Sequence, residues 1–224
     1  RANGLEENTI VIFTSDNGPW LVKRQEGGSA GPFRSGKVST WEGGVRVPCI
    51  FWAPGRVPAD RVCSEPAATL DILPTFSALA GVAAPADRRL DGLDLSDLLH
   101  GKTDRSPRDT FHYYLWTHLQ AVRKGGWKLH LPRPGQPEWI MPLLRVRHIE
   151  AADAQDITEP LLYDLESDPG ERYDVAAKHP EIVKDMLAHA ARVREDLGDY
   201  DQLGRNVRFY DPMDARPTAP QRAN

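Results

Sequence analysis

Cysteine is scarce in this sequence, and long apolar runs are absent. The two cysteines, Cys49 and Cys63, are too few for a disulfide framework and lack the spacing of a zinc site. The sequence leaves two alternatives open: a single disulfide bridge between them, or two buried free thiols. No stretch approaches the roughly 20 apolar residues that span a bilayer, so we expect no transmembrane segment. The chain begins at Arg1, without Met or the apolar core of a signal peptide, so we expect a piece of a longer protein and leave its compartment open.

Charge of one sign is not in excess either. The sequence has 28 lysines and arginines against 32 aspartates and glutamates, which gives a formal charge of −4. This balance provides no electrostatic reason to expect nucleic acid or an anionic membrane as a partner. A hydrophobic content of 40% and a charged content of 27% are ordinary for a globular protein, and 224 residues suffice for one large domain or two small ones.

Several catalytic signatures are missing. The sequence contains no Ser-His-Asp order, no G-x-S-x-G nucleophile motif and no glycine fingerprint of a dinucleotide site. Its seven histidines form no i, i+4 pair with a supporting carboxylate, which a helical metal site requires. None of these common motifs therefore explains the chain.

The first half of the sequence predicts an incomplete α/β domain. The segment 8–14, NTIVIFT, is a continuous apolar run typical of a buried strand, and 47–55, VPCIFWAPG, is a second one. A glycine-rich stretch between them predicts loops, and 71–81, DILPTFSALAG, predicts a helix with Pro74 in its first turn. Two buried strands and one helix cannot cover both faces of a parallel sheet. We therefore expect strands outside this chain to cover it, with an oligomer as the alternative.

The pattern changes in the second half to short alternating segments. They lie at 109–116, 119–132 and 160–165, and Lys124-Gly125-Gly126 is a natural hairpin turn. Such segments are typical of an antiparallel meander rather than of another strand-helix-strand unit.

One long helix is expected after the meander. Residues 133–159 are proline-rich and irregular, which predicts a surface loop, and 179–199 predicts a helix because its apolar residues form one stripe. The expected organisation is an α/β part at 1–106, an antiparallel subdomain at 107–202 and an irregular tail at 203–224.

Asp16 and Asn17 stand where the first predicted strand ends. Open α/β sheets place their ligands at the carboxyl ends of strands. A carboxylate and an amide offer two hard oxygen ligands, which suit Ca²⁺ or Mg²⁺. The sequence Asp-Asn-Gly-Pro is also ideal for a turn, and taken alone it favours a turn over a metal site.

Two cations and one histidine are further candidates. Gly36 lets the backbone pass close to a ligand, and Lys37 is a compact charge suited to a tetrahedral oxyanion, although a solvated surface lysine is the alternative. Arg46 lies between two valines and is predicted to be structural, paired with Glu42. His130 lies on a predicted strand, where a histidine is either a functional group or a structural one.

The order of these motifs resembles the sulfatase family, and within it the arylsulfatase A group. The resemblance rests on NTIVIFTSDNGP, GPFRSGKVSTWEGGVRVPCIFWAPG, TLDILPTFSALAG and LDGLDLSDLLHG, in this order. In the second half it rests on AVRKGGWKLH and LLYDLESDPGERYDVAAKHPEIV. It extends from about Gly4 to Leu197, and it is specific because several unusual motifs recur in one fixed order.

The resemblance implies a fold and a set of site residues. The implied fold is alkaline-phosphatase-like α/β: a partial mixed sheet flanked by helices, followed by a small antiparallel sheet with one long helix. Asp16 and Asn17 would bind a divalent cation, usually Ca²⁺. Lys37 would be catalytic and hold an oxygen of a sulfate-ester substrate, and His130 would lie near that substrate. The family also implies a periplasmic, extracellular or lysosomal location.

The catalytic group of sulfatases is absent from the chain. They use a formylglycine made from the cysteine of a C-x-P-S-R motif, and neither Cys49 nor Cys63 stands in one. The family places this motif, and further metal-binding aspartates, before the SDNG strand. We therefore expect the C-terminal part of a sulfatase, inactive alone and completed by its N-terminal portion. The alternatives are a phosphate or phosphonate ester hydrolase of the same superfamily and a non-catalytic structural module. The substrate stays open.

Overall fold

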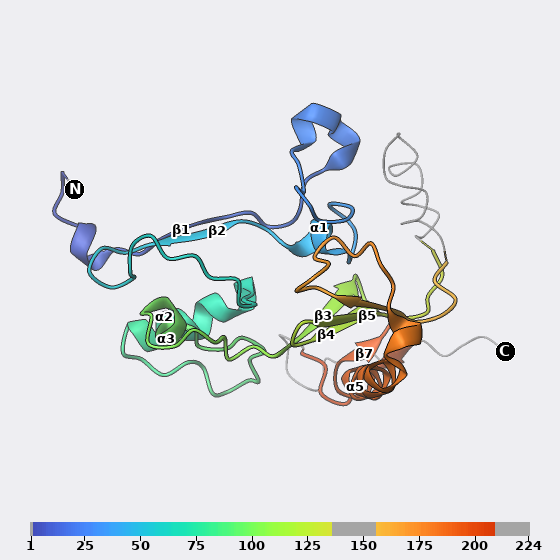
Figure 1. The fold of residues 1–224 in the computed structure, drawn as a ribbon. Helices are drawn as coiled ribbons and strands as arrows, with labels where there is room; N and C mark the ends of the chain where they lie inside the picture. Colours follow the sequence, from blue (N-terminus) through green and yellow to red (C-terminus); the bar gives the residue numbers. More distant parts are fainter. Residues whose placement is uncertain (1, 136–155, 209–224) are drawn as a thin grey trace. The chain divides into compact units, whose positions relative to one another are not determined.

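The chain divides into two compact units. A computed structural model describes residues 2–135 and 156–208 (Figure 1). Unit 1 comprises Arg1–Asp16 and Val47–Asp109, and unit 2 comprises Asn17–Arg46 and Thr110–Asn224. A division by compactness is not a division by domain, so the predicted domain boundaries stay predictions. Most of the predicted loop and of the predicted tail lies outside the described residues.

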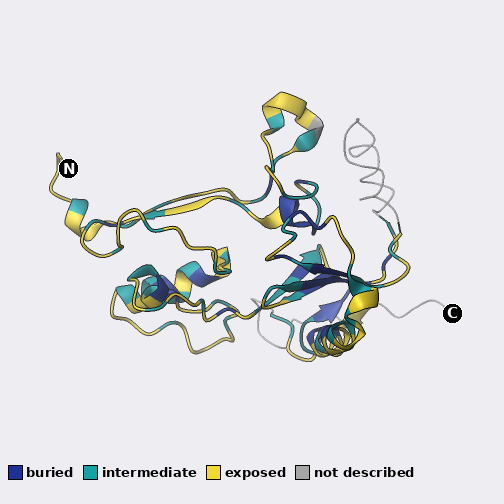
Figure 2. Cartoon of the chain, viewed as in Figure 1, coloured by how far each residue is buried: buried dark blue, intermediate teal, exposed yellow. Residues whose placement is uncertain are grey.

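Unit 1 contains the two strands predicted in the first half. After a short 3-10 helix, η1 (Glu6–Asn8), strand β1 (Val11–Thr14) pairs antiparallel with β2 (Cys49–Trp52). The positions of the strands are confirmed. Within this chain both strands are mostly exposed, and their cover by strands outside it stays a prediction. Phe13 is 69% exposed and Ile50 is 59% exposed. Figure 2 shows the ribbon in the colours of exposed and intermediate residues. Among the described residues, no third strand joins this ribbon, so its apolar side chains stay in contact with solvent.

Unit 1 also contains helical segments and a buried ion pair. The 3-10 helix η3 (Thr69–Asp71) leads into α2 (Ile72–Leu79), which confirms the predicted helix, and α3 (Ser96–Leu99) follows. The carboxylate of Asp71 accepts hydrogen bonds from Arg108 Nε at 3.0 Å and also from Arg108 Nη2. Asp71 is fully buried and also accepts the backbone N–H groups of Ala68 and Leu93, each at 2.8 Å. These bonds compensate for the cost of burying the charge.

Unit 2 is built on the predicted antiparallel meander. Its four-stranded sheet has the order β3 (Thr110–Leu115), β4 (His118–Lys124), β5 (Trp127–His130) and β6 (Leu161–Asp164). Lys124 pairs with Trp127 across Gly125-Gly126, which confirms the predicted hairpin turn. Gly125 has a φ of 56°, a value that this kind of turn requires and that glycine adopts without strain.

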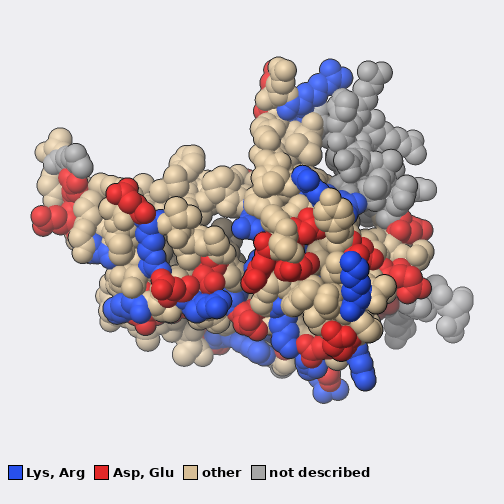
Figure 3. All heavy atoms as spheres, in the orientation of Figure 1, with Lys and Arg blue, Asp and Glu red and all other residues tan. Residues whose placement is uncertain are grey.

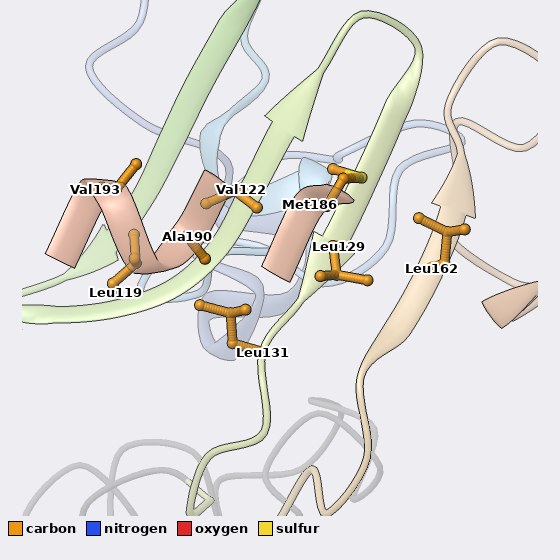
Figure 4. Close-up of a cluster of buried hydrophobic side chains, with 8 residues drawn as sticks. All are labelled: Leu119, Val122, Leu129, Leu131, Leu162, Met186, Ala190 and Val193. Carbon is orange, nitrogen blue, oxygen red and sulfur yellow. The ribbon is translucent and has the colours of Figure 1, made fainter. Parts of the chain in front are cut away.

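The long helix packs on this sheet. A 3-10 turn, η5 (Ala176–Lys178), precedes α5 (Pro180–Leu197), which confirms the predicted helix, and the short strands β7 (Gly198–Asp199) and β8 (Gln202–Leu203) follow. Figure 4 shows apolar side chains of the sheet and of α5 directed toward one another. This buried cluster consists of Leu119, Val122, Leu129, Leu131, Leu162, Met186, Ala190 and Val193.

The glycine-rich stretch of unit 2 is mostly loop, as predicted. It contains only a kinked 3-10 segment, η2 (Leu21–Gly27), and one helical turn, α1 (Glu42–Val45). Both cysteines of the chain are free and exposed, so they are neither bridged nor buried. In the described part of the chain, no helix is long and apolar enough to cross a membrane. Figure 3 shows cationic and anionic side chains mixed over the visible face, in keeping with the small net charge.

Candidate functional site

The turn after β1 is held against helix α1 in unit 2. Asp16 is exposed, Asn17 is half-buried and Gly18 is buried. The Gly18 N–H donates to the Gly44 oxygen at 2.9 Å. A Cβ atom on Gly18 would lie 1.8 Å from the Gly43 oxygen, so only glycine fits this contact. The glycine of the SDNG motif therefore fixes the position of the backbone that carries Asn17.

The loop that carries Lys37 lies beside this turn. The Lys37 N–H donates to the Pro19 oxygen at 2.9 Å, and a Cβ atom on Gly36 would lie 2.5 Å from the same oxygen. The side chain of Lys37 is exposed, and its Nζ lies 5.8 Å from the ring centroid of Trp20. The backbone of the Lys37 loop is thus hydrogen-bonded to the turn that follows Asn17.

The backbone around Lys37 is strained. Ser35 has a φ of 63° and Val38 a φ of 70°, both in the left-handed region. For a β-branched residue such as Val38 this conformation is a genuine outlier, and it costs on the order of 1–3 kcal/mol. Such strain persists only where the surrounding structure imposes it, and it is typical of functional loops.

Arg46 has the structural role that the sequence predicted. Its Nη1 lies 3.9 Å from Glu42 Oε2, and its guanidinium lies 4.6 Å from the ring centroid of Phe33. Glu42 itself is only 2% exposed. Arg46 therefore partners a buried carboxylate and does not stand among the ligand-binding candidates.

A buried charged cluster lies behind the Lys37 loop, and we call it the anchor cluster. It comprises Glu42, Lys128, His130 and Glu171. Lys128 Nζ donates to the Thr40 oxygen at 2.7 Å and to Glu42 Oε1 at 2.9 Å, and it lies 3.0 Å from Glu171 Oε1. Glu171 Oε2 accepts the backbone N–H of Glu42 at 2.6 Å. One buried ammonium group is thus shared between two carboxylates.

His130 is a neutral member of the anchor cluster. Its ring is fully buried and stacks on Trp41 with centroids 3.9 Å apart. Its Nε2 lies 2.7 Å from Glu171 Oε1, and its Nδ1 lies 3.3 Å from Arg133 Nη1. Because a guanidinium only donates, Nδ1 accepts and the proton belongs on Nε2. Burial lowers the pKa of His130 to about 3, against the attraction of Glu171.

The Glu171 carboxylate is ionised. Burial alone would raise its pKa, but the nearby Lys128 ammonium and the hydrogen bond from His130 outweigh burial and lower the pKa to about 2. Glu171 therefore accepts hydrogen bonds from the Glu42 backbone and from His130, and it forms an ion pair with Lys128.

The predicted site residues differ in how the structure places them. Asn17 and Lys37 belong to neighbouring loops, whereas His130 is enclosed and has both ring nitrogens paired with protein groups. Its predicted place near the substrate stays a prediction. Among residues 2–135 and 156–208, no group of three or more His, Cys, Asp or Glu side chains is arranged to hold a metal ion. Asp16 and Asn17 still offer the hard oxygen donors that Ca²⁺ and Mg²⁺ prefer.

Sequence reasoning missed three members of the anchor cluster as a unit: Glu42, Lys128 and Glu171. One signal was present. Lys128 lies on a strand between Trp127 and Leu129, and a charged residue at a buried strand position requires a partner of opposite charge. The identity of that partner does not follow from any local pattern, because Glu42 and Glu171 lie far from Lys128 in the sequence.

Comparisons with known proteins identify the family. Residues 1–82 match the family described as sulfatase, and residues 106–221 match the C-terminal region of aryl-sulfatase. The second match alone covers more than half of the chain. The chain belongs to the sulfatase family.

Individual relatives agree with this assignment. Human (Homo sapiens) arylsulfatase A is 41% identical over 190 residues, which are 81% of this chain and 37% of that protein. Steryl-sulfatase of Mus musculus is 37% identical over 212 residues, which are 85% of this chain and 34% of that protein. The crystal structure of PsFucS1 sulfatase from Pseudoalteromonas sp. matches with a TM-score of 0.67 and 31% identity, over 86% of this chain and 39% of that one.

These matches establish the fold and the extent of the likeness. The neighbours are sulfatases, so the fold is the alkaline-phosphatase-like α/β fold that the resemblance implied. The chain spans little more than a third of the length of the curated relatives it matches.

Proposed function

We propose that the chain is the C-terminal portion of a sulfatase that hydrolyses sulfate esters. The observation that carries this proposal is the docking of the Lys37 loop on the turn of Asn17, through the bond from the Lys37 N–H to the Pro19 oxygen. A lysine loop docked on a turn that offers oxygen ligands to a divalent cation suits an anionic tetrahedral group, because the ammonium group and the bound cation would both attract it. In this proposal the nucleophile is a formylglycine supplied by the rest of the enzyme. This chain supplies the Lys37 ammonium group and the metal-binding oxygens of Asp16 and Asn17.

Lys37 is the catalytic residue that we assign to this chain. Its ammonium group would bind one sulfate oxygen and stabilise the negative charge that develops on the sulfate and on the departing oxygen. The strained backbone on both sides of Lys37 fixes the loop conformation from which the side chain extends, so the loop need not be ordered during the reaction.

Asp16 and Asn17 would contribute two oxygen ligands to a divalent cation, Ca²⁺ or Mg²⁺. Such an ion polarises a sulfate oxygen when it is bound. Two ligands leave the coordination shell of Ca²⁺, which takes 6–8 oxygens, largely incomplete. Calorimetric titration of the 224-residue chain with Ca²⁺ should therefore give a dissociation constant weaker than micromolar. A sub-micromolar constant would contradict this assignment.

The exposed ribbon of unit 1 fits the same proposal. Phe13 and Ile50 lie on strands whose sequences are those of a buried sheet, yet both are mostly exposed. We assign the remaining strands of a sulfatase sheet as their cover, supplied by the N-terminal portion, with a homo-oligomer as the competing arrangement. For location we propose the periplasm, the extracellular space or the lysosome.

An assay of sulfate-ester hydrolysis by the full-length protein, encoded by the whole reading frame that contains this chain, tests the proposal. The assay compares p-nitrophenyl sulfate with p-nitrophenyl phosphate, so a phosphate ester hydrolase gives the opposite preference. Lys37→Ala should lower kcat by about 100-fold, the size of effect expected for one lost charge-stabilising group. The exposed Lys184→Ala variant is the matched control and should keep full activity. Preference for the phosphate ester, or full activity of Lys37→Ala, would overturn the proposal.

A further inference from the structure

We propose that Glu171 and Lys128 are positioning residues that hold the Lys37 loop in its working geometry. This inference rests on the proposed function, because it assigns the anchor cluster to the site that contains Lys37. Neither side chain reaches solvent, so neither acts on a substrate directly within this structure. Each acts through the backbone of the segment from Arg34 to Glu42.

Both ends of that segment converge on Glu171. At one end, Arg34 Nη1 donates to the backbone oxygen of Glu171 at 3.2 Å. At the other end, the Glu42 N–H donates to the Glu171 carboxylate at 2.6 Å. The Gly43 N–H also donates to the Arg34 oxygen at 2.8 Å, which closes the loop on itself. Glu171 thus contacts both ends of the loop that carries Lys37 and reinforces this closure.

Lys128 connects this closed loop to the sheet. Its strand β5 lies between β4 and β6, with Lys128 opposite Arg123 on one side and Tyr163 on the other. Its ammonium group donates to the Thr40 oxygen and to Glu42. Tyr113 on β3 adds a hydrogen bond to the same Glu42 oxygen at 3.1 Å. Since the sheet is held by its own apolar core, the position of the loop follows from the position of the sheet.

The same support reaches the turn of Asn17. Helix α1 begins at Glu42, and its Gly44 oxygen accepts the N–H of Gly18. The Lys37 N–H in turn donates to the oxygen of Pro19. A displacement of Glu42 would therefore move both the turn and the loop. Directional hydrogen bonds specify such a geometry, which apolar packing alone does not.

Hydrogen exchange on the full chain tests this inference without any requirement for activity. The reporter amides are those of Gly18, Lys37 and Gly43, and the reference amides are those of α5. We expect Glu171→Ala and Lys128→Met to accelerate exchange of the reporters at least about tenfold more than exchange of the reference amides, because local opening then precedes global unfolding. Glu171→Gln, which keeps the side-chain length and an acceptor for the Glu42 N–H, should restore part of the protection. Lys184→Met is the matched control and should leave both sets unchanged.

The outcomes separate this inference from the proposed function. Reporters that exchange at the parent rate in all three anchor variants would overturn it. Equal acceleration of the reporter and reference amides in Glu171→Gln would also overturn the inference, because it would mean that the substitution destabilises the whole unit and not the loop in particular. Where Glu171→Ala does not fold, the exchange data of Glu171→Gln and Lys128→Met decide.

Kinetics of the full-length enzyme give a second test. If the protein encoded by the whole reading frame hydrolyses sulfate esters, Glu171→Gln should lower kcat with a smaller change in KM. An unchanged kcat overturns the inference and leaves the proposed function intact. An inactive parent enzyme refutes the proposed function, and the exchange data still decide whether the loop is anchored.

Discussion

Unit 1 and unit 2 bury very different kinds of side chains. In unit 2, eight apolar residues form one enclosed cluster between the sheet and α5, and a charged cluster lies on the side of the Lys37 loop. In unit 1, Asp71 and Arg108 form a buried ion pair, while apolar residues of the strands face solvent. The difference teaches that an element can be formed correctly by its own sequence and still depend on other chain segments for its burial.

The largest expected effect concerns the ion pair of unit 1. Asp71→Ala removes the partner of a nearly buried guanidinium and should destabilise unit 1 by about 3–5 kcal/mol. Hydrogen exchange of the α2 amides measures this change. The exposed pair of Asp87 and Arg88 supplies the control, because Asp87→Ala removes a contact that solvent already screens. Equal effects of the two substitutions would show that unit 1 is not organised around Asp71.

Truncation of the apolar core of unit 2 should be costly. Leu129 is fully buried, so Leu129→Ala should lower the free energy of unfolding of unit 2 by about 2–5 kcal/mol, through lost transfer energy and a cavity. Urea denaturation followed by the exchange of α5 amides measures it. A loss well below 1 kcal/mol would mean that the cluster in Figure 4 does not stabilise the unit.

Acid should weaken unit 2 through His130 and Glu171. The pKa of His130 is lowered from its usual value of about 6.5 to about 3. Between pH 6.5 and pH 3, the histidine therefore binds a proton in the unfolded chain but not in the folded chain. The pKa of Glu171 is lowered to about 2, so the stability that it contributes above about pH 4.5 is lost as the pH falls toward 2. Stability should fall by about 1.4 kcal/mol per pH unit below 6.5, and more steeply below 4.5.

Urea denaturation at a series of pH values measures this slope. His130→Gln keeps a donor toward Glu171 but does not titrate, so it should flatten the curve between pH 6.5 and 4.5. An unchanged slope in this variant would show that another group causes the acid sensitivity.

The smallest expected effect belongs to the ribbon of unit 1. Phe13 is 69% exposed, so Phe13→Ala should change the stability of the chain by no more than about 0.5 kcal/mol. The same urea experiment measures it, with Leu129→Ala as the reference. A loss comparable to that of Leu129→Ala would mean that β1 is buried in solution, through self-association of the ribbon.

Local patterns predicted the elements well and the contacts between them poorly. The helix at Pro180–Leu197 and the hairpin at Gly125-Gly126 were evident because periodicity and turn chemistry are local properties. Asp16, Asn17 and Lys37 were evident as candidates from their motifs. The cover of β1 and β2 stays a prediction, because an apolar strand shows that it needs cover but not where the cover lies.

The pairing of charges in the anchor cluster was beyond local reasoning. The N–H of Glu42 and the carboxylate of Glu171 are 129 residues apart in the sequence, and no local pattern pairs them. The paired charges of Asp71 and Arg108 are 37 residues apart and pose the same difficulty. Such pairs are selected by the assembled fold.

Hydrogen exchange of the unmodified chain tests the central claim most directly, which is that the Lys37 loop shares the stability of the sheet behind it. The amides of Lys37 and Gly43 should be protected to an extent similar to those of β4, whereas those of β1 should exchange much faster. Loop amides that exchange as fast as those of β1, while β4 stays protected, would contradict the claim.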